Sequence, residues 1–249
     1  MPQPEQILSM KGIHAGERAF IVGCGPSLLK QIDILPMLKD ELTFVCNGWP
    51  HWEDAPFEGT YYCLTDVKEG HGPMLQWPDH NFKRILIDFP QRNNREDMPE
   101  FIYVEKAIDS KQMAEYGFVG LTDTLPALPT GWTTPLTAMQ VAAWMGVREF
   151  YLIGCDFTDS GYAWDPDASK EWHLPNGHHY REFTYRSAMG VWQSAERARA
   201  DIEQAGGSFI DCTPQGYLNP TAKGPFPSQS HKGLGYKPLE EVLDVVLAE

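Results

Sequence analysis

The chain has 249 residues and a formal net charge of −14, with 42% hydrophobic and 22% charged residues. It is long enough to bury a core, and it holds no uninterrupted apolar stretch of the roughly 18 residues that a membrane span needs. The acidic balance excludes a broad nucleic-acid surface, because phosphate binding depends on Lys and Arg.

The N-terminal stretch and the cysteines indicate a cytoplasmic protein. The first twelve residues, MPQPEQILSMKG, lack the basic-then-apolar plan of a secretion signal. The five cysteines are odd in number and widely spaced, and no CxxC pair suggests zinc. We therefore expect small buried thiols rather than a disulfide framework.

Short apolar, β-rich runs predict seven strands that are buried on both faces. They cover residues 19–24, 42–47, 60–66, 84–89, 100–105, 149–154 and 208–212. Helices are predicted at 28–38, 134–145, 187–205 and 238–247. Strands that alternate with helices indicate an α/β fold, a single domain over 1–249 with a doubly wound, mostly parallel sheet of the Rossmann-like kind.

The helix predictions depend on local signals. Pro36 is expected to end or kink the first helix. Thr133 or Thr134 caps the second, with Pro135 in its first turn and Gly146 just past its end. The pair Gly206-Gly207 stops the third helix.

Residues 157–186 show no clear helix or strand and are rich in Trp, Tyr, His and Asp. A stretch of this length without regular structure in a compact domain is usually a lid or a binding loop. We therefore predict a lid or substrate loop at 157–186.

The stretch Gly23-Cys24-Gly25-Pro26-Ser27 spans the end of the first predicted strand and its exit loop. It lacks the third glycine of the dinucleotide fingerprint and the Gly-Lys-Ser/Thr of a P-loop. By itself it fits a phosphate-binding loop and a tight strand-to-helix corner equally well.

Polar residues at the ends of other strands favour the binding interpretation. Asn47, Asp66 and Asp156 each lie at the carboxyl end of a predicted strand. Ligands bind beyond the carboxyl ends of parallel strands, so these side chains are expected to face one crevice.

Five segments of the chain, residues 23–28, 46–47, 133–134, 151–157 and 162–165, come in an order that resembles the bacterial sialyltransferases of glycosyltransferase family 42. It is also similar to the related superfamily of motility-associated glycosyltransferases and MptE-like 6-hydroxymethylpterin diphosphokinases. The likeness runs from about residue 18 to about 218. The resemblance implies a glycosyltransferase fold, a GT-A-like variant with a lid loop.

The resemblance implies that the loop 23–27 holds the donor nucleotide near its phosphate and that Asn47 contacts the donor. It implies that Thr133 and Thr134 meet a cytidine nucleotide, and that Tyr162 stabilises the leaving phosphate. Thr158 stands where the family has a second tyrosine. The implied donor-binding residues are Gly23, Cys24, Gly25, Pro26, Ser27, Asn47, Asp66, Thr133, Thr134, Asp156 and Thr158.

The family's general base is a His in the loop before the long helix. Here that loop holds His178 and His179. The simplest alignment pairs the family's His-Tyr with His179-Tyr180 and puts the catalytic position near Phe183, so a gap is needed to bring either His into the role. His178 and His179 are the candidate bases, because the pKa of His lies near neutral pH.

We therefore expect transfer of a sugar from a nucleotide-activated donor, most simply a CMP-linked one, to an acceptor hydroxyl, with no required metal. The first alternative is a diphosphokinase that uses ATP, with Mg²⁺ held by Asp66 and Asp156. The second is a nucleotide-binding protein without catalysis. The expected partners are the nucleotide sugar and its acceptor, and the sequence also allows a homo-oligomer.

Overall fold

A computed structural model describes residues 4–65, 83–88, 101–107, 112–157, 162–164, 180–214, 218 and 235–244, without the side chains of 51, 84, 86–88 and 180–188. Its strands are β1 (Arg18–Val22), β2 (Leu42–Cys46), β3 (Tyr61–Thr65), β4 (Lys83–Asp88), β5 (Phe101–Glu105), β6 (Glu149–Ile153), β7 (Ser208–Asp211) and β8 (Gly235–Tyr236). Its α-helices are α1 (Glu5–Leu8), α3 (Met113–Tyr116), α4 (Thr134–Trp144), α5 (Tyr180–Gln204) and α6 (Leu239–Val242). Its 3₁₀-helices are η1 (Pro26–Gln31), η2 (Leu35–Asp40), η3 (Trp49–His51) and η5 (Val119–Leu121).

The strands form one sheet in the order β5-β4-β3-β2-β1-β6-β7-β8, and every adjacent pair is parallel. The chain moves outward from β1 to β5, then crosses back to place β6 on the other side of β1. The order therefore reverses between β1 and β6, as in doubly wound α/β folds. The predicted fold class is confirmed.

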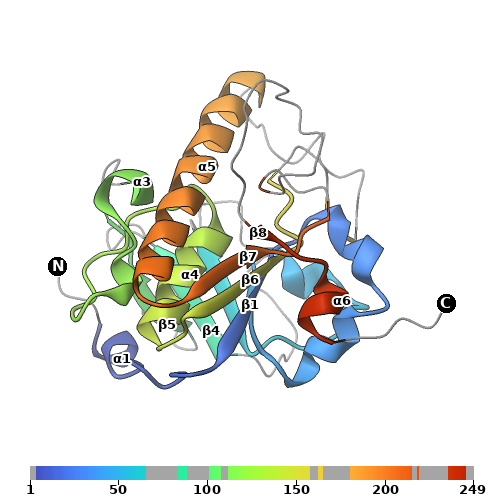
Figure 1. Cartoon of the computed structure of the whole chain (residues 1–249), viewed down its shortest axis with the longest axis horizontal. Helices are drawn as coiled ribbons and strands as arrows, with labels where there is room; N and C mark the ends of the chain where they lie inside the picture. The colour runs from blue at the N-terminus through green and yellow to red at the C-terminus, as the bar shows by residue number, and fades with distance from the viewer. Residues whose placement is uncertain are drawn as a thin grey trace.

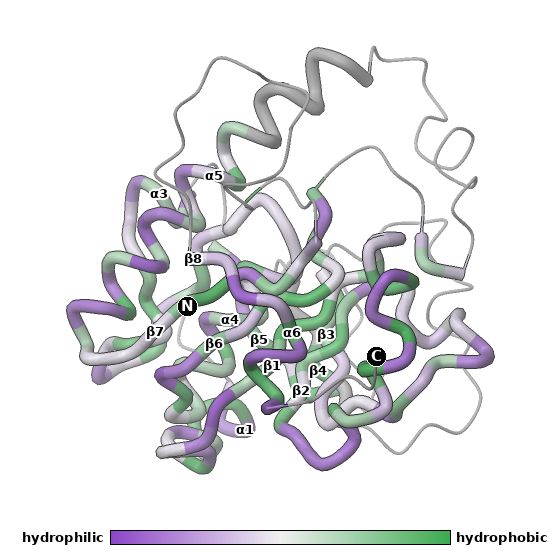
Figure 2. The backbone as a smooth tube through the Cα atoms, turned by 45° about the vertical axis from the view of Figure 1, so that its right-hand side comes forward, coloured by the Kyte–Doolittle hydropathy of each residue, from purple (hydrophilic) through white to green (hydrophobic). Residues whose placement is uncertain are grey.

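Two hydrophobic cores lie on the two faces of the sheet. Side chains alternate along β1, so Ile21 packs in the core with α4 and α5, while Phe20 and Val22 pack in the core with η1, η2 and α6. Figure 1 shows α4 and α5 on one side of the strands, and α6 with the blue 3₁₀ segments on the other. The central strands β1 and β2 are largely green, and so hydrophobic, in Figure 2, as expected for strands covered on both faces.

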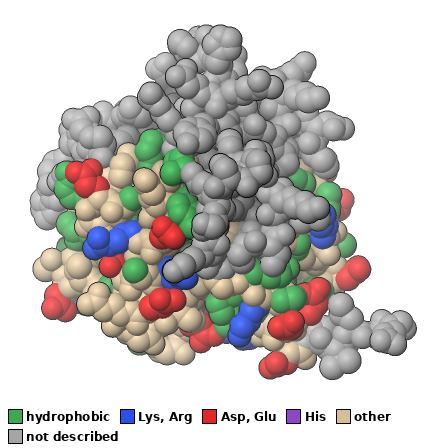
Figure 3. All heavy atoms as spheres, turned by 45° about the horizontal axis from the view of Figure 1, so that its top comes forward, with side chains coloured by type: hydrophobic (Ala, Val, Ile, Leu, Met, Phe, Trp, Pro, Cys, Tyr) green, Lys and Arg blue, Asp and Glu red, His purple; other side chains and the backbone are tan. Residues whose placement is uncertain are grey.

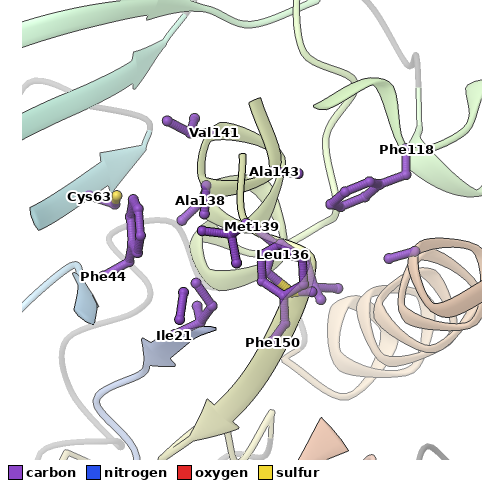
Figure 4. Close-up of a cluster of buried hydrophobic side chains, with 14 of the residues drawn as sticks. Ile21, Phe44, Cys63, Phe118, Leu136, Ala138, Met139, Val141, Ala143 and Phe150 are labelled. Carbon is purple, nitrogen blue, oxygen red and sulfur yellow. The ribbon is translucent and has the colours of Figure 1, made fainter. Parts of the chain in front are cut away.

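Helix α4 is buried on all sides, and all eleven of its residues are in the core. The small side chains of Ala138 and Ala143 allow close approach, and Figure 4 shows the helix between Ile21 and Phe44 on one side and Phe118 on the other. As predicted, Thr133 is its N-cap. The burial of this helix fixes its N-terminus beside the exits of β2 and β3.

Three helix predictions need correction in type or extent. The helix predicted at 28–38 is two short 3₁₀-helices, η1 and η2, because Pro36 removes a backbone donor and disfavours an α-helical residue before it. Helix α5 begins at Tyr180 rather than Ser187, since no helix breaker lies between them, so its start falls inside the predicted loop. Helix α6 ends at Val242, close to Asp244 with its left-handed φ of 53°.

The surface and the cysteines of the described part agree with the sequence. Lys and Arg side chains are scattered on the face in Figure 3 rather than gathered into one basic patch. All five cysteines are free, and four are buried. Within the described ranges, no helix has the length and apolar character needed to cross a membrane.

Candidate functional site

The carboxyl ends of β1 and β6 lie side by side where the strand order reverses. Ligands of open parallel sheets bind outside the strand ends at this point. The Gly23 N–H donates to the Ile153 carbonyl (2.8 Å), and the Gly25 N–H donates to the Gly154 carbonyl (2.9 Å). The predicted nucleotide loop therefore lies directly against the exit loop of β6.

Close packing of these two loops requires glycine at positions 23 and 25. A Cβ on Gly23 would lie 2.3 Å from the Gly154 carbonyl oxygen, and one on Gly25 would lie 1.7 Å from Asp156 Oδ2. Both distances are far below van der Waals contact. The glycines of the loop thus have a packing role that is independent of any ligand.

The carboxylate of Asp156 packs against the loop 23–27, beside Gly25 and Ser27. Its Oδ2 accepts a hydrogen bond from Ser27 Oγ (2.7 Å), and the carboxylate also accepts from the Ser27 backbone N–H. Burial raises the pKa of Asp156, and the hydrogen bonds from Ser27 oppose that rise. The backbone N–H of Ser27, which a phosphate-binding loop would offer to its ligand, is thus already bonded to the Asp156 carboxylate. The remaining lone pairs of that carboxylate can accept a hydrogen bond from a ligand hydroxyl.

Asn47 follows β2 in the left-handed backbone region, with φ of 50°. Its N–H donates to the Cys63 carbonyl (3.0 Å), and its own carbonyl accepts from Tyr62 Oη (2.5 Å). Its side-chain Oδ1 accepts from Thr134 Oγ1 (2.7 Å). These contacts hold a backbone conformation that non-glycine residues rarely adopt and fix Asn47 at the carboxyl end of β2.

The predicted cytidine-binding pair uses its hydroxyls within the protein. The Thr133 side chain accepts a long hydrogen bond from the Leu136 N–H (3.5 Å) at the start of α4. Thr134 is only 4% exposed, and its hydroxyl contacts both Asn47 and Thr65. Thr134 therefore lies on the buried side of Asn47, and its hydroxyl is bonded within the protein.

Tyr162 belongs to a short described segment that contacts the exit of β1. The Ala163 N–H donates to the Cys24 carbonyl (2.9 Å). The Tyr162 ring stacks on Trp164, with centroids 4.9 Å apart and an interplanar angle of 8°. Burial raises the pKa of Tyr162, so its hydroxyl keeps its proton and can act as a donor.

Asp211, at the end of β7, is a residue that the sequence analysis missed. It is fully buried; its Oδ1 accepts from the Thr213 N–H (2.9 Å), and Thr213 Oγ1 accepts from the Cys155 N–H (3.1 Å). Burial raises the pKa of Asp211 to about 7. The sequence does contain a sign of this residue. Asp211 is a carboxylate within the apolar run SFIDC, residues 208–212, where the strand pattern predicts a buried side chain.

Four predicted site residues lie outside the described residues: Asp66, Thr158, His178 and His179. The structure thus brings together the loop 23–27, Asn47, Thr134 and Asp156, with the Tyr162 segment beside them. The two candidate bases and the second carboxylate of the predicted Mg²⁺ pair stay predictions. In the described ranges, no three His, Cys, Asp or Glu residues are grouped as a metal site.

An aromatic cavity lies immediately beyond Asn47. It has a volume of about 160 Å³ and is lined by Trp49, Pro50, Trp52, Glu53, Ala55, Phe57 and Glu58. Trp52 also contacts Trp164, with centroids 6.4 Å apart. A larger cavity of about 330 Å³, between η5 and the end of α5, lies away from the strand exits. The smaller cavity is thus the one next to the candidate site.

Fold and site together define a doubly wound, Rossmann-like α/β protein with polar residues gathered at the carboxyl ends of its strands near the switch point. No family model and no curated protein matches the chain. Among solved structures, it is similar to the sialyltransferase CstII from Campylobacter jejuni, solved in complex with a substrate analogue, cytidine-5'-monophosphate. The two chains are 15% identical over 81% of this chain and 82% of that chain, with a TM-score of 0.44.

Proposed function

We propose that the protein is a glycosyltransferase that takes a sugar from a CMP-linked donor, most simply an acidic sugar, and attaches it to an acceptor hydroxyl. The observation that carries this proposal is the gathering of Asn47, Asp156 and the Tyr162 segment around the exits of adjacent strands. These residues supply amide, carboxylate and phenol groups at the switch point, where doubly wound folds bind ligands. The resemblance to family 42 supports cytidine as the nucleotide.

The reaction is a displacement at the anomeric carbon. The acceptor oxygen forms a bond to that carbon while the bond to the phosphate oxygen of CMP breaks. The acceptor proton passes to a base, for which His178 and His179 are the candidates. Negative charge grows on the departing phosphate, and a hydrogen bond from the Tyr162 hydroxyl stabilises it there.

Asp156 has a different role in this proposal. A carboxylate bonded to Ser27 accepts hydrogen bonds from hydroxyl groups and repels phosphate. We therefore assign Asp156 to a ribose or sugar hydroxyl of the donor. The phosphate then needs donors elsewhere in the crevice.

Release of CMP from CMP-N-acetylneuraminic acid, measured with and without Mg²⁺, tests the proposal. We expect slow, metal-independent CMP release that an acceptor sugar accelerates. Tyr162→Phe keeps the ring that stacks on Trp164 but removes the hydroxyl, so it is expected to lower kcat by about tenfold to a hundredfold with little change in stability.

His178→Ala and His179→Ala identify the base, because only loss of the base is expected to abolish acceptor-dependent transfer. No CMP release under any condition would contradict the glycosyltransferase proposal. Mg²⁺-dependent consumption of ATP in the presence of a pterin would support the diphosphokinase instead.

A further inference from the structure

Trp132 has an unusual backbone conformation for a large side chain. It directly precedes Thr133, the N-cap of α4, and its φ of 68° lies in the left-handed region. That conformation brings the Cβ of an ordinary residue too close to the following carbonyl oxygen, so glycine is the residue that suits it. Bulky residues in this region are rare, and such outliers cluster at ligand-binding sites. The chain nevertheless has a tryptophan here.

A glycine in α5 makes room for the indole of Trp132. A Cβ on Gly190 would lie 2.2 Å from Trp132 Nε1 and 2.3 Å from its Cε2, so the pyrrole part of the indole lies directly on the helix backbone. Glycine inside a helix is less favourable than alanine. Two residues that are each unfavourable for their local structure therefore fit together, and the pair fixes the position of the indole.

This contact spans the side of the sheet on which the strand order reverses. Helix α4 packs on β1, β2 and β3, whereas α5 packs on β7, and β6 lies between β1 and β7. The start of α4 lies at the carboxyl edge of the sheet, because Thr134 Oγ1 is 2.7 Å from Asn47 Oδ1. An indole that joins the start of α4 to α5 therefore lies near the exits of β1 and β6.

The indole of Trp132 also keeps a large accessible surface. It is 39% exposed, whereas four other described tryptophans, Trp49, Trp52, Trp144 and Trp192, are at most 9% exposed. An indole supported by a helix backbone and still exposed offers a fixed aromatic surface on which a flat ring can stack.

We propose that Trp132 binds the nucleobase of the donor by stacking against it. The inference rests on the proposed function for the identity of the ligand, and the base is the aromatic ring of a CMP-linked donor. Asn47 and Asp156 supply hydrogen-bonding groups but no ring surface, and the Tyr162 ring already stacks on Trp164. Stacking on a fixed aromatic side chain is a general way to bind a base.

The first test is calorimetric titration with CMP and with ribose 5-phosphate, which has no base. Trp132→Ala should weaken CMP binding by about tenfold to a hundredfold, the usual effect of losing one base–aromatic stack. It should leave the affinity for ribose 5-phosphate unchanged. Trp132→Phe keeps an aromatic ring and should lose less affinity for CMP. Tyr116→Ala is the matched control, because Tyr116 is 51% exposed but lies on α3, and it should bind CMP normally.

Gly190→Ala tests the support of the indole without changing Trp132. The added methyl group would lie 2.2 Å from the indole and displace it, although alanine itself favours a helix. We expect weaker CMP binding in Gly190→Ala but no further loss when it is combined with Trp132→Ala, because the methyl group then has space. Normal CMP binding by Trp132→Ala, or an equal loss for CMP and ribose 5-phosphate, would overturn the proposal.

Tryptophan fluorescence separates this proposal from the proposed function. A base stacked on an indole quenches its emission, so CMP should quench the unmodified protein more strongly than Trp132→Phe. If CMP does not bind but UMP, AMP or GMP gives quenching that depends on Trp132, the proposed function fails and the stacking role stands. If none of the four nucleotides gives quenching that depends on Trp132, the stacking role is refuted, whether or not CMP binds.

Discussion

Two carboxyl groups, one half-buried and one buried, contribute to the electrostatics of the strand exits. Asp156 and Asp211 both lie there, and burial raises the pKa of each carboxyl group. The charge of Asp211 also raises the cost of ionising its neighbours, including Cys155. The Asp211 carboxyl at the end of β7 therefore changes its protonation state near neutral pH.

Asp211→Asn should change how stability depends on pH. Native Asp211 holds its proton up to about pH 7, whereas the unfolded chain loses that proton near its ordinary pKa of about 4. Between these values the unfolded state binds fewer protons, so this group makes stability fall as pH rises, by at most about 4 kcal/mol. The variant lacks this loss, so its stability relative to the original protein, measured by urea unfolding, should improve from about pH 5 to about pH 7 and level off above it.

Asp123→Asn is the control for that series, since Asp123 is exposed and its side chain forms an ion pair with Lys11 at the surface. Its stability difference should not vary over the same pH range. A constant difference for Asp211→Asn as well would show that the Asp211 carboxyl is not buried as described.

Gly23→Ala should destabilise the protein through the contact between the exit loops of β1 and β6. The added Cβ would lie 2.3 Å from a backbone oxygen, which cannot move aside as a flexible side chain could. We expect a loss of about 1–3 kcal/mol, the usual cost of overpacking, in urea unfolding. Gly235→Ala meets no atom within 4 Å and should be neutral, and equal stability of the two variants would contradict the packing role of Gly23.

The elements differ in how well their sequences predict them. The strands were predicted within a residue or two, because strands buried on both faces give continuous apolar runs with clear limits. The segment predicted as a first α-helix forms two 3₁₀-helices instead. Its apolar pattern favours a helix, but Pro36 interrupts the backbone hydrogen bonds that a continuous α-helix needs. Strand β8 was missed because two residues, Gly235 and Tyr236, carry no periodicity.

Thr133→Ala should remove the cap of α4. A capping Thr satisfies one of the free N–H groups at a helix start, so we expect a loss of about 1 kcal/mol in urea unfolding. Thr133→Ser keeps the capping oxygen and should retain most of the stability. An unchanged midpoint for Thr133→Ala would mean that the 3.5 Å contact to the Leu136 N–H contributes nothing.

For the whole molecule, the fold and the lining-up of polar residues at the carboxyl edge of the sheet could be predicted, but the contacts among those residues could not. Alternation of strands and helices implied the parallel sheet, and polar residues after strands marked its carboxyl edge. The contacts of Thr134 with Asn47 and Thr65 join residues 87 and 69 positions apart, and no local pattern encodes them. The pairing of Asp156 with Ser27 depends likewise on the crossover that brings β6 beside β1.

The thiols report on the integrity of both cores. Four of the five cysteines are buried, and burial raises the pKa of these four thiols, so little thiolate forms at neutral pH. The native protein should react slowly with a thiol reagent such as DTNB, and five thiols should react after unfolding. Rapid reaction of two or more thiols in the native state would contradict the burial described here.

The measurement that bears most directly on the central claim is thermal stabilisation by CMP, CDP, UDP, GDP and ATP, each with and without Mg²⁺. A ligand that binds only the native state raises the melting temperature as its concentration exceeds Kd. We predict a rise with CMP that is independent of Mg²⁺ and is reduced in Asn47→Ala. A rise with ATP alone that requires Mg²⁺ would contradict a cytidine-nucleotide site and favour diphosphate transfer.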